Sequence, residues 1–161
     1  MTKDEAIAFL KDQGHYCEPV VVSEDACRIG FKFRGAEIEL FTSQADPDYV
    51  YLRCGYRLEP ANRDELLARR ALAQIQDDLK VVKLGLTLED EAGVFATAEQ
   101  FLADGPSFAP IFWRTVSLVY DASNRAWREL NTTVVADEAA DRFTEALEAE
   151  LQKPTKKPDS E

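Results

Sequence analysis

The sequence of 161 residues carries 30 Asp and Glu against 19 Lys and Arg, which gives a formal charge of −11 at pH 7. A charge of this sign repels nucleic acid and anionic membranes, so neither is expected as a partner, and basic protein partners are favoured. The length and the hydrophobic fraction of 45% predict one domain with one core.

The first predicted element is a short helix near the N-terminus. Residues Thr2 to Glu5 form a capping box, in which the threonine hydroxyl accepts from the Glu5 amide and the Glu5 side chain reaches back. Apolar residues follow at helical spacing, namely Ala6, Ile7, Phe9 and Leu10. Gly14 can close the helix in a left-handed conformation.

Strand-rich sequence follows in EPVVVSEDACRIGFKFRGAEIELF, with turns predicted at 23–25 and at Arg34-Gly35. A two-residue turn at Arg34-Gly35 places apolar residues opposite each other on one face and an ion pair on the other. The predicted facing pairs are Phe33 with Ala36, Lys32 with Glu37, Phe31 with Ile38, and Ile29 with Leu40. A fourth strand is predicted over 49–58.

A second helix is predicted after another capping box at 62–65, because apolar residues then recur at steps of three and four. These residues are Ala68, Ala71, Leu72, Ile75 and Leu79.

A second hairpin follows, with 89–93 as its loop. Its predicted facing pairs are Leu88 with Val94, Leu86 with Ala96, Leu84 with Ala98, and Lys83 with Glu99. The acidic run Glu89-Asp90-Glu91 is interpreted as a solvated loop tip, and a metal or acid–base cluster is the alternative.

The third predicted helix, beginning near Phe108, has more apolar surface than one sheet requires. Two adjacent stripes cover roughly 220° of its circumference, whereas packing on one sheet needs only about 100°. The first stripe comprises Phe108, Ile111, Phe112, Thr115, Leu118, Val119, Ala122 and Ala126. The second comprises Trp113, Val116, Tyr120 and Trp127, and these four are the predicted partner or dimer surface. Either the C-terminal segment or a second subunit could cover them, and the second subunit is slightly favoured.

A separate C-terminal helix is predicted over 132–152, with a boundary at the polar residues 131–133. A disordered tail is predicted over 153–161. Residues 1–131 would then form a single domain. The expected fold class is α+β, with an antiparallel sheet flanked by helices in the order helix, three to four strands, helix, hairpin, helix, and with the extra C-terminal helix beside it.

Groups that carry chemistry are sparse in the sequence. No nucleotide-binding or nucleophile motif is found, so no catalytic residue, cofactor or metal is expected. The three cysteines lack metal-ligand spacing and are expected to be reduced and mostly buried, in a cytoplasmic protein. No apolar run approaches the roughly 20 residues of a membrane span, and the N-terminus lacks the apolar core of a signal peptide. His15 is expected at the surface or at the boundary of the core.

The chain resembles the YbjN family, which is provisionally assigned to bacterial sensory transduction regulation. The resemblance rests on four segments that together span most of residues 9–120. They are FLKDQGHYCEPVV, CRIGFKFRGAEIELF, ADPDYVYLRCGYRL and NRDELLARRALAQIQDDLKVVKLGLTLEDEAGVFATAEQFL. The resemblance implies a fold similar to type III secretion chaperones, often dimeric, and it implies no catalytic residues. The extra C-terminal helix and the basic tail depart from the family pattern.

Three functions are therefore considered. The favoured one is a non-enzymatic binding or regulatory protein, chaperone-like or sensory-regulator-like, that holds a protein partner on its sheet or helix surface. The first alternative is a carboxylate-based or metal-assisted enzyme that uses Glu37, Glu39 and the cluster 89–91. The second alternative is a structural homodimer component with the third helix as its interface.

Overall fold

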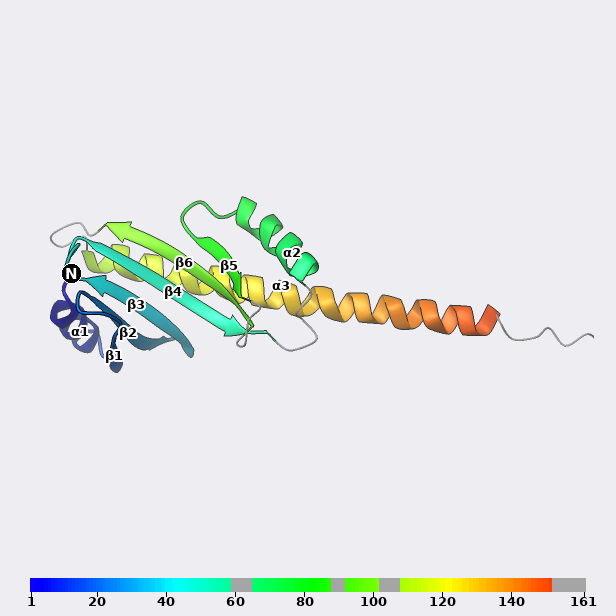
Figure 1. The fold of residues 1–161 in the computed structure, drawn as a ribbon, viewed down its shortest axis with the longest axis horizontal. Coiled ribbons are helices and arrows are strands. Elements are labelled where there is room, and N and C mark those ends of the chain that lie inside the picture. Colours follow the sequence, from blue (N-terminus) through cyan, green and yellow to red (C-terminus); the bar gives the residue numbers. More distant parts are fainter. Residues whose placement is uncertain (59–64, 88–91, 102–107, 152–161) are drawn as a thin grey trace, which may run out of the picture.

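The computed structural model describes residues 1–58, 65–87, 92–101 and 108–151, with side chains described as far as residue 131. The described residues contain three helices and six strands. Their order is α1 (Lys3–Asp12), β1 (Cys17–Val21), β2 (Ala26–Phe33), β3 (Ala36–Ser43), β4 (Tyr49–Arg57), α2 (Glu65–Asp77), β5 (Lys83–Thr87), β6 (Gly93–Phe101) and α3 (Phe108–Leu151) (Figure 1). The strands form one antiparallel sheet in the order β1-β2-β3-β4-β6-β5, which confirms the predicted α+β class.

The N-terminal helix and the first hairpin form as predicted. The Thr2 and Glu5 side chains make the reciprocal capping-box contacts, and Gly14 follows α1 with φ of 81°. Between β2 and β3, Arg34 and Gly35 have φ of 49° and 85°. Positive φ at both central residues is the geometry that matches the twist of a two-residue hairpin. All four predicted facing pairs of this hairpin are confirmed.

The predicted register of the second hairpin was wrong by two residues. Leu86 faces Val94 and Leu84 faces Ala96, where the prediction paired each leucine two residues further along β6. A two-residue shift keeps every side chain on its face, so the apolar pattern alone could not separate the two registers. The observed register instead places Phe95 opposite Gly85, where a Cβ atom would lie 2.3 Å from the ring. Glycine therefore permits the ring to lie against the neighbouring strand.

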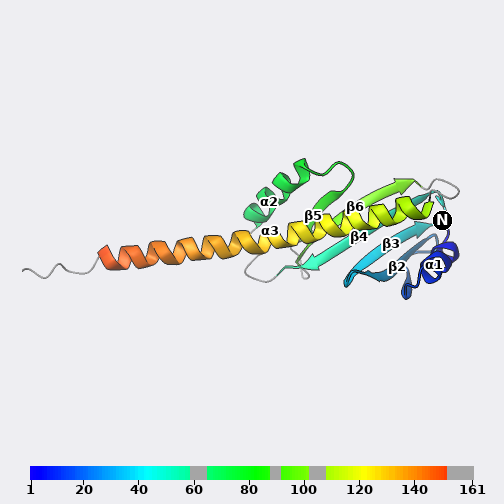
Figure 2. The ribbon, with the colours of Figure 1, turned by 180° about the vertical axis from the view of Figure 1, so that it is seen from behind.

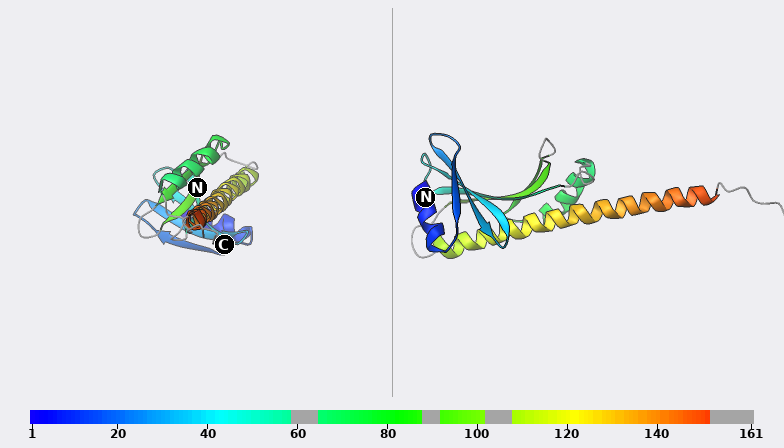
Figure 3. Two further views of the ribbon diagram at one scale, coloured as in Figure 1. Left: turned by 90° about the vertical axis from the view of Figure 1, so that its right-hand side faces the viewer. Right: turned by 90° about the horizontal axis from the view of Figure 1, so that it is seen from below.

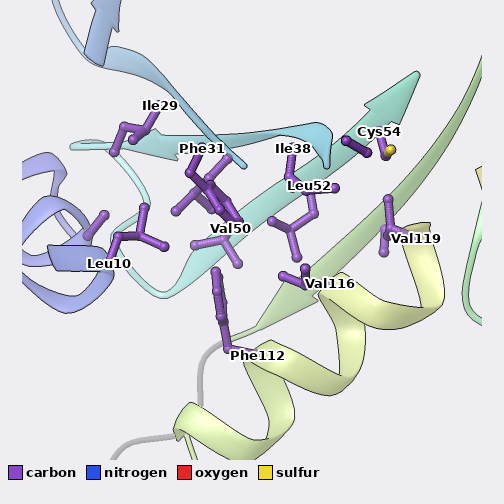
Figure 4. Packing of buried hydrophobic residues seen from close by; sticks show 14 of the residues in the cluster. Leu10, Ile29, Phe31, Ile38, Val50, Leu52, Cys54, Phe112, Val116 and Val119 are labelled. Carbon is purple, nitrogen blue, oxygen red and sulfur yellow. The ribbon is translucent and has the colours of Figure 1, made fainter. Parts of the chain in front are cut away.

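The three helices all pack on one face of the sheet. Leu10 of α1 and Phe112 of α3 share a core with the inward-facing residues of β2, β3 and β4 (Figure 4). At the other end of the sheet, Ile75 of α2 packs with Val94 and with Ala126 of α3. Figure 2 shows α3 lying across the strands from this side.

Helix α3 continues without interruption from Phe108 to Leu151 over 44 residues. The segment predicted as a C-terminal helix over 132–152 is helical as far as Leu151, but it continues α3 instead of forming a separate helix. Asn131, Thr132 and Thr133 have modest helix propensity, but none is glycine or proline, so the helical backbone continues through them. The C-terminal part of α3 extends past the sheet and α2 (Figures 1 and 3). The side chains of residues 132–151 lie outside the described residues.

Three sequence predictions fall largely or wholly on residues that the structure does not describe. They are the capping box at 62–65, of which only Glu65 is described, the acidic tip at 89–91 and the tail from 153.

Candidate functional site

The predicted partner or dimer surface on α3 is largely engaged within the chain. Val116 is completely buried and therefore belongs to the core instead of an exposed surface. The Trp113 ring is stacked on His15 at 4.8 Å, and Tyr120 meets Phe33 edge-on at 5.8 Å. Trp127 lies 5.8 Å from the Tyr56 ring. Whether the half-buried Trp113, Tyr120 and Trp127 also meet a partner stays a prediction.

Helix α3 is rotated about its axis relative to the prediction. Its buried side includes Phe112, Val116 and Val119, while Ile111 and Leu118 from the predicted first stripe are 42% and 39% exposed. The surplus apolar surface is covered by α1, the β2–β3 hairpin and β4. The prediction considered only the C-terminal segment and a second subunit as covers for this surface. It did so because it assumed that only one of the two stripes contacts the sheet.

The other face of the sheet carries none of the described helices, and we call it the open face; it is turned toward the viewer in Figure 1, with α3 behind the strands. Its side chains are those that alternate with the buried residues of β2 to β6. The open-face residues used below are Arg28, Glu39, Phe41, Tyr49, Tyr51, Arg53, Lys83, Phe95, Glu99 and Phe101.

A charged network occupies the centre of the open face. The Glu39 carboxylate is 2.9 Å from the Arg28 guanidinium and 3.7 Å from that of Arg53, and its side chain is only 20% exposed. The Arg53 guanidinium also lies over the Phe95 ring, 4.4 Å from its centroid. Glu39 therefore positions one arginine against an aromatic face, a favourable cation–π contact.

Aromatic side chains gather at the end of the open face where β4 begins and β6 ends. We call Phe41, Tyr49, Tyr51 and Phe101 the aromatic end. Phe41 meets Tyr51 edge-on at 5.3 Å, and Tyr49 meets Phe101 at 5.6 Å. Phe101 is 75% exposed. Burial raises the pKa of Tyr49, and the negative charges of Glu99 and Asp46 raise it further, so both carboxylates act on this end of the sheet.

The edge of the sheet at β1 is blocked by a proline. Val22 donates to the carbonyl of Ala26, which makes that facing pair a hydrogen-bonded one. Hydrogen-bonded pairs alternate along an antiparallel ladder, so the backbone groups of Pro19, opposite Ile29, point away from β2. Proline has no N–H, so the free edge lacks its central donor.

Replacing Pro19 with valine is expected to open this edge to self-association. The variant restores a donor beside the exposed Val20 and Val21, so a second β1 can pair with it. Light scattering should show mass rising with concentration for Pro19→Val but not for Glu18→Val, which adds the same side chain next to an intact proline. Equal behaviour of the two variants would show that Pro19 does not protect the edge.

The opposite edge, at β5, is covered by a side chain. The Gln76 side chain, which extends from α2, donates from Nε2 to the Val82 carbonyl at 3.0 Å and accepts from the Leu84 amide at 2.7 Å. Gln76 thus occupies backbone groups that an added strand would need. Both edges therefore resist strand addition, which leaves the open face as the accessible part of the sheet.

The three cysteines are free and buried, as predicted. Burial raises the pKa of the Cys54 thiol to about 11, against an ordinary value of 9.0. The Ser123 hydroxyl donates to the Cys54 carbonyl at 3.0 Å and joins β4 to α3 at this point. Thiolate chemistry at Cys54 is therefore disfavoured near neutral pH.

The raised pKa of Cys54 predicts a loss of stability at alkaline pH. Between pH 9 and 11 the thiol ionises in the unfolded chain but stays protonated in the folded one, so the folded state loses stability as pH rises. From pH 8 to 10.5, urea unfolding should show wild type losing on the order of 1–2 kcal/mol more than Cys54→Ala. Parallel pH profiles of the two proteins would contradict this assignment.

Two hollows lined by described residues of the open face are small. One of about 220 Å³ lies over Gly30, lined by Tyr16, Glu18, Lys32 and Glu37, and another of about 150 Å³ lies beside Arg53. Both are below the roughly 300–1,000 Å³ of typical small-molecule pockets. Among the described residues, no group of three or more His, Cys, Asp or Glu side chains is arranged to hold a metal ion.

No helix in the described parts of the chain has the length and hydropathy needed to cross a membrane.

Comparison with solved structures identifies the architecture. YbjN from E. coli, provisionally described as a transcription regulator, superposes with a TM-score of 0.56 at 13% identity, over 83% of this chain and 94% of its own. The chain has a YbjN-like fold. An uncharacterized protein from Methanothermobacter thermautotrophicus shares it, with a TM-score of 0.61 at 13% identity, over 83% of this chain and 99% of its own.

No protein-family model and no curated protein matches the sequence. The similarity to YbjN is therefore a similarity of fold. Of the family resemblance predicted from the sequence, the fold is the part that is confirmed.

Proposed function

We propose that this chain is a non-enzymatic binding or regulatory protein that holds a segment of a protein partner on its open face. One observation carries the proposal: the three helices among the described residues pack on one side of the sheet, and the other side presents arginine, tyrosine and phenylalanine side chains. Aromatic residues and arginine are enriched where proteins bind each other, and they dominate the energy of such contacts.

The sheet edges support contact through the face. Pro19 removes a donor from one edge, and Gln76 occupies the other. A partner segment bound by side-chain contacts across the strands needs neither edge. Arg53, held by Glu39 against Phe95, is already ordered, so binding there costs little side-chain entropy.

The carboxylates of the enzyme alternative are engaged in ion pairs. Glu37 lies 3.5 Å from the Lys32 amine, and Glu39 is shared between two arginines. Glu39 is mostly buried between its two arginines, which supports a structural role over an acid–base role for this carboxylate. The Glu37 pair is exposed and contributes little either way. The third predicted component, the cluster at 89–91, lies outside the described residues.

The fold neighbours are consistent with a regulatory protein, since YbjN is provisionally described as a transcription regulator. Membership of the YbjN family, a chaperone-like mode of holding the partner, a cytoplasmic location and a homodimeric state belong to the same proposal. Chaperone-like holding would use the open face, while a homodimer would use the half-buried rings of α3.

The proposal is tested by quantitative capture from lysate of the cells that make this protein. Wild type is compared with Phe41→Ala/Tyr51→Ala on the open face and with the matched pair Ile111→Ala/Leu118→Ala on α3. We expect a protein retained by wild type and by the α3 pair to be at least about tenfold depleted with the open-face pair. Equal retention by all three would contradict the proposal, provided circular dichroism shows each variant folded.

A further inference from the structure

We propose that the aromatic end of the open face receives an arginine or lysine side chain of the partner. This inference rests on the proposed function and names the chemistry of the segment that the face would hold. It is carried by four aromatic rings and two carboxylates that share one end of the sheet.

The rings of the aromatic end are both ordered and accessible. Tyr51 is fixed edge-on by Phe41 and Tyr49 by Phe101, so their positions are set by neighbouring strands. Phe101 keeps most of its surface exposed. The rings therefore present polarised π surfaces that a cation can approach from solvent.

Carboxylates next to these rings make this end favourable for a positive charge. Glu99 lies on β6 directly opposite Tyr51, and Asp46 belongs to the loop that leads into β4. The Lys83 amine lies 3.5 Å from Glu99, but both side chains are more than half exposed. An exposed pair of this kind contributes little, so an incoming cation can compete for Glu99.

Other surface rings of this chain already bind guanidinium groups. Arg53 lies over Phe95 at 4.4 Å, and Arg34 lies over Phe33 at 5.1 Å and Tyr120 at 5.7 Å. Within the described ranges, no such guanidinium is placed over the four rings of the aromatic end. The aromatic end therefore resembles the surroundings of Arg53 and Arg34, which combine aromatic rings with a carboxylate. Here the positive charge would come from the partner.

The negative charge of the aromatic end favours one kind of bound segment over the others. A second copy bound through the same patch would bring its own Asp46 and Glu99 against these carboxylates, which is repulsive. A neutral apolar segment would bury the carboxylates without compensation. A basic segment can form cation–π contacts with the rings and ion pairs with the carboxylates.

The test uses two peptides that differ only in charge, namely an acetylated, amidated Gly-Arg-Gly-Gly-Arg-Gly and the same peptide with citrulline in place of arginine. Binding to the full chain is followed by NMR signals of the aromatic rings and backbone amides. We expect the arginine peptide to shift Tyr49, Tyr51 and Phe101 signals and to bind at least about tenfold more tightly than the citrulline peptide.

Two exposed-site variants locate the contact. Phe101→Ala and Glu99→Gln should each weaken the arginine peptide severalfold, while the matched controls Leu66→Ala and Glu129→Gln should not. Equal affinity for both peptides, or shifts confined to other parts of the chain, would overturn the inference. In that case a partner still captured through Phe41 and Tyr51 would leave the proposed function standing.

Discussion

Replacing Phe112 with alanine is expected to lower the free energy of unfolding by about 3–5 kcal/mol. Phe112 is fully buried, and its ring lies 5.2 Å from Phe9 and 6.4 Å from Phe31, so it joins α3 to α1 and to the sheet. Removing it leaves a cavity where three elements meet. Urea unfolding followed by circular dichroism measures the loss.

The neighbouring Ile111 supplies the control for Phe112. It is one residue away on the same helix but 42% exposed, so Ile111→Ala should cost less than about 1 kcal/mol. Because the sequence pattern assigned both residues to one buried stripe, the comparison also tests the observed rotation of α3. Similar losses for the two variants would contradict the structure on this point.

Replacing Gly85 with alanine is expected to cost about 1–3 kcal/mol, because the new Cβ atom would lie 2.3 Å from the Phe95 ring. The ring must then move away from β5, which also disturbs the guanidinium of Arg53 resting on it. Stability is measured by urea unfolding, as for Phe112.

A double-mutant cycle with Phe95→Ala isolates this contact. In the Phe95→Ala background the new methyl group meets no ring, so Gly85→Ala should become nearly neutral. A cost that is unchanged in that background would mean that Gly85 and Phe95 do not face each other. The register first predicted from the sequence, two residues away, would then regain support.

Local signals predicted most of the fold correctly. The hairpin at Arg34-Gly35 was predictable because a tight turn and an opposed pair, Lys32 with Glu37, both specify the same register. The second hairpin was not, because its apolar residues repeat every two positions and fit either register equally well. The observed register places the large Phe95 ring opposite Gly85, which has no side chain. A pattern of apolar and polar residues does not record this difference in size.

The continuous α3 was missed for a related reason. The segment Asn131 to Thr133 is polar and weakly helix-forming, and it was interpreted as a boundary. A helix ends where the backbone must turn or where a cap is provided, and the structure shows neither at this point.

The candidate site was only partly visible in the sequence. Tyr49, Tyr51 and Arg53 lie in the predicted fourth strand, but the sequence pointed to the rings of α3 as the binding surface. Those rings are partly used by α1 and by the β2–β3 hairpin, a tertiary arrangement that a helical wheel does not contain. The signal that could have revealed the open face is the run of aromatic residues at alternating strand positions.

Site-specific photo-cross-linking tests the central claim, that the open face holds a protein partner, most directly. A photoreactive benzoylphenylalanine is introduced in place of Tyr51 on the open face or in place of Leu118 on α3, in the cells that make this protein. The account predicts a discrete cross-linked protein from position 51 that is absent from position 118. Adducts from position 118 alone, or none from either position, would contradict it.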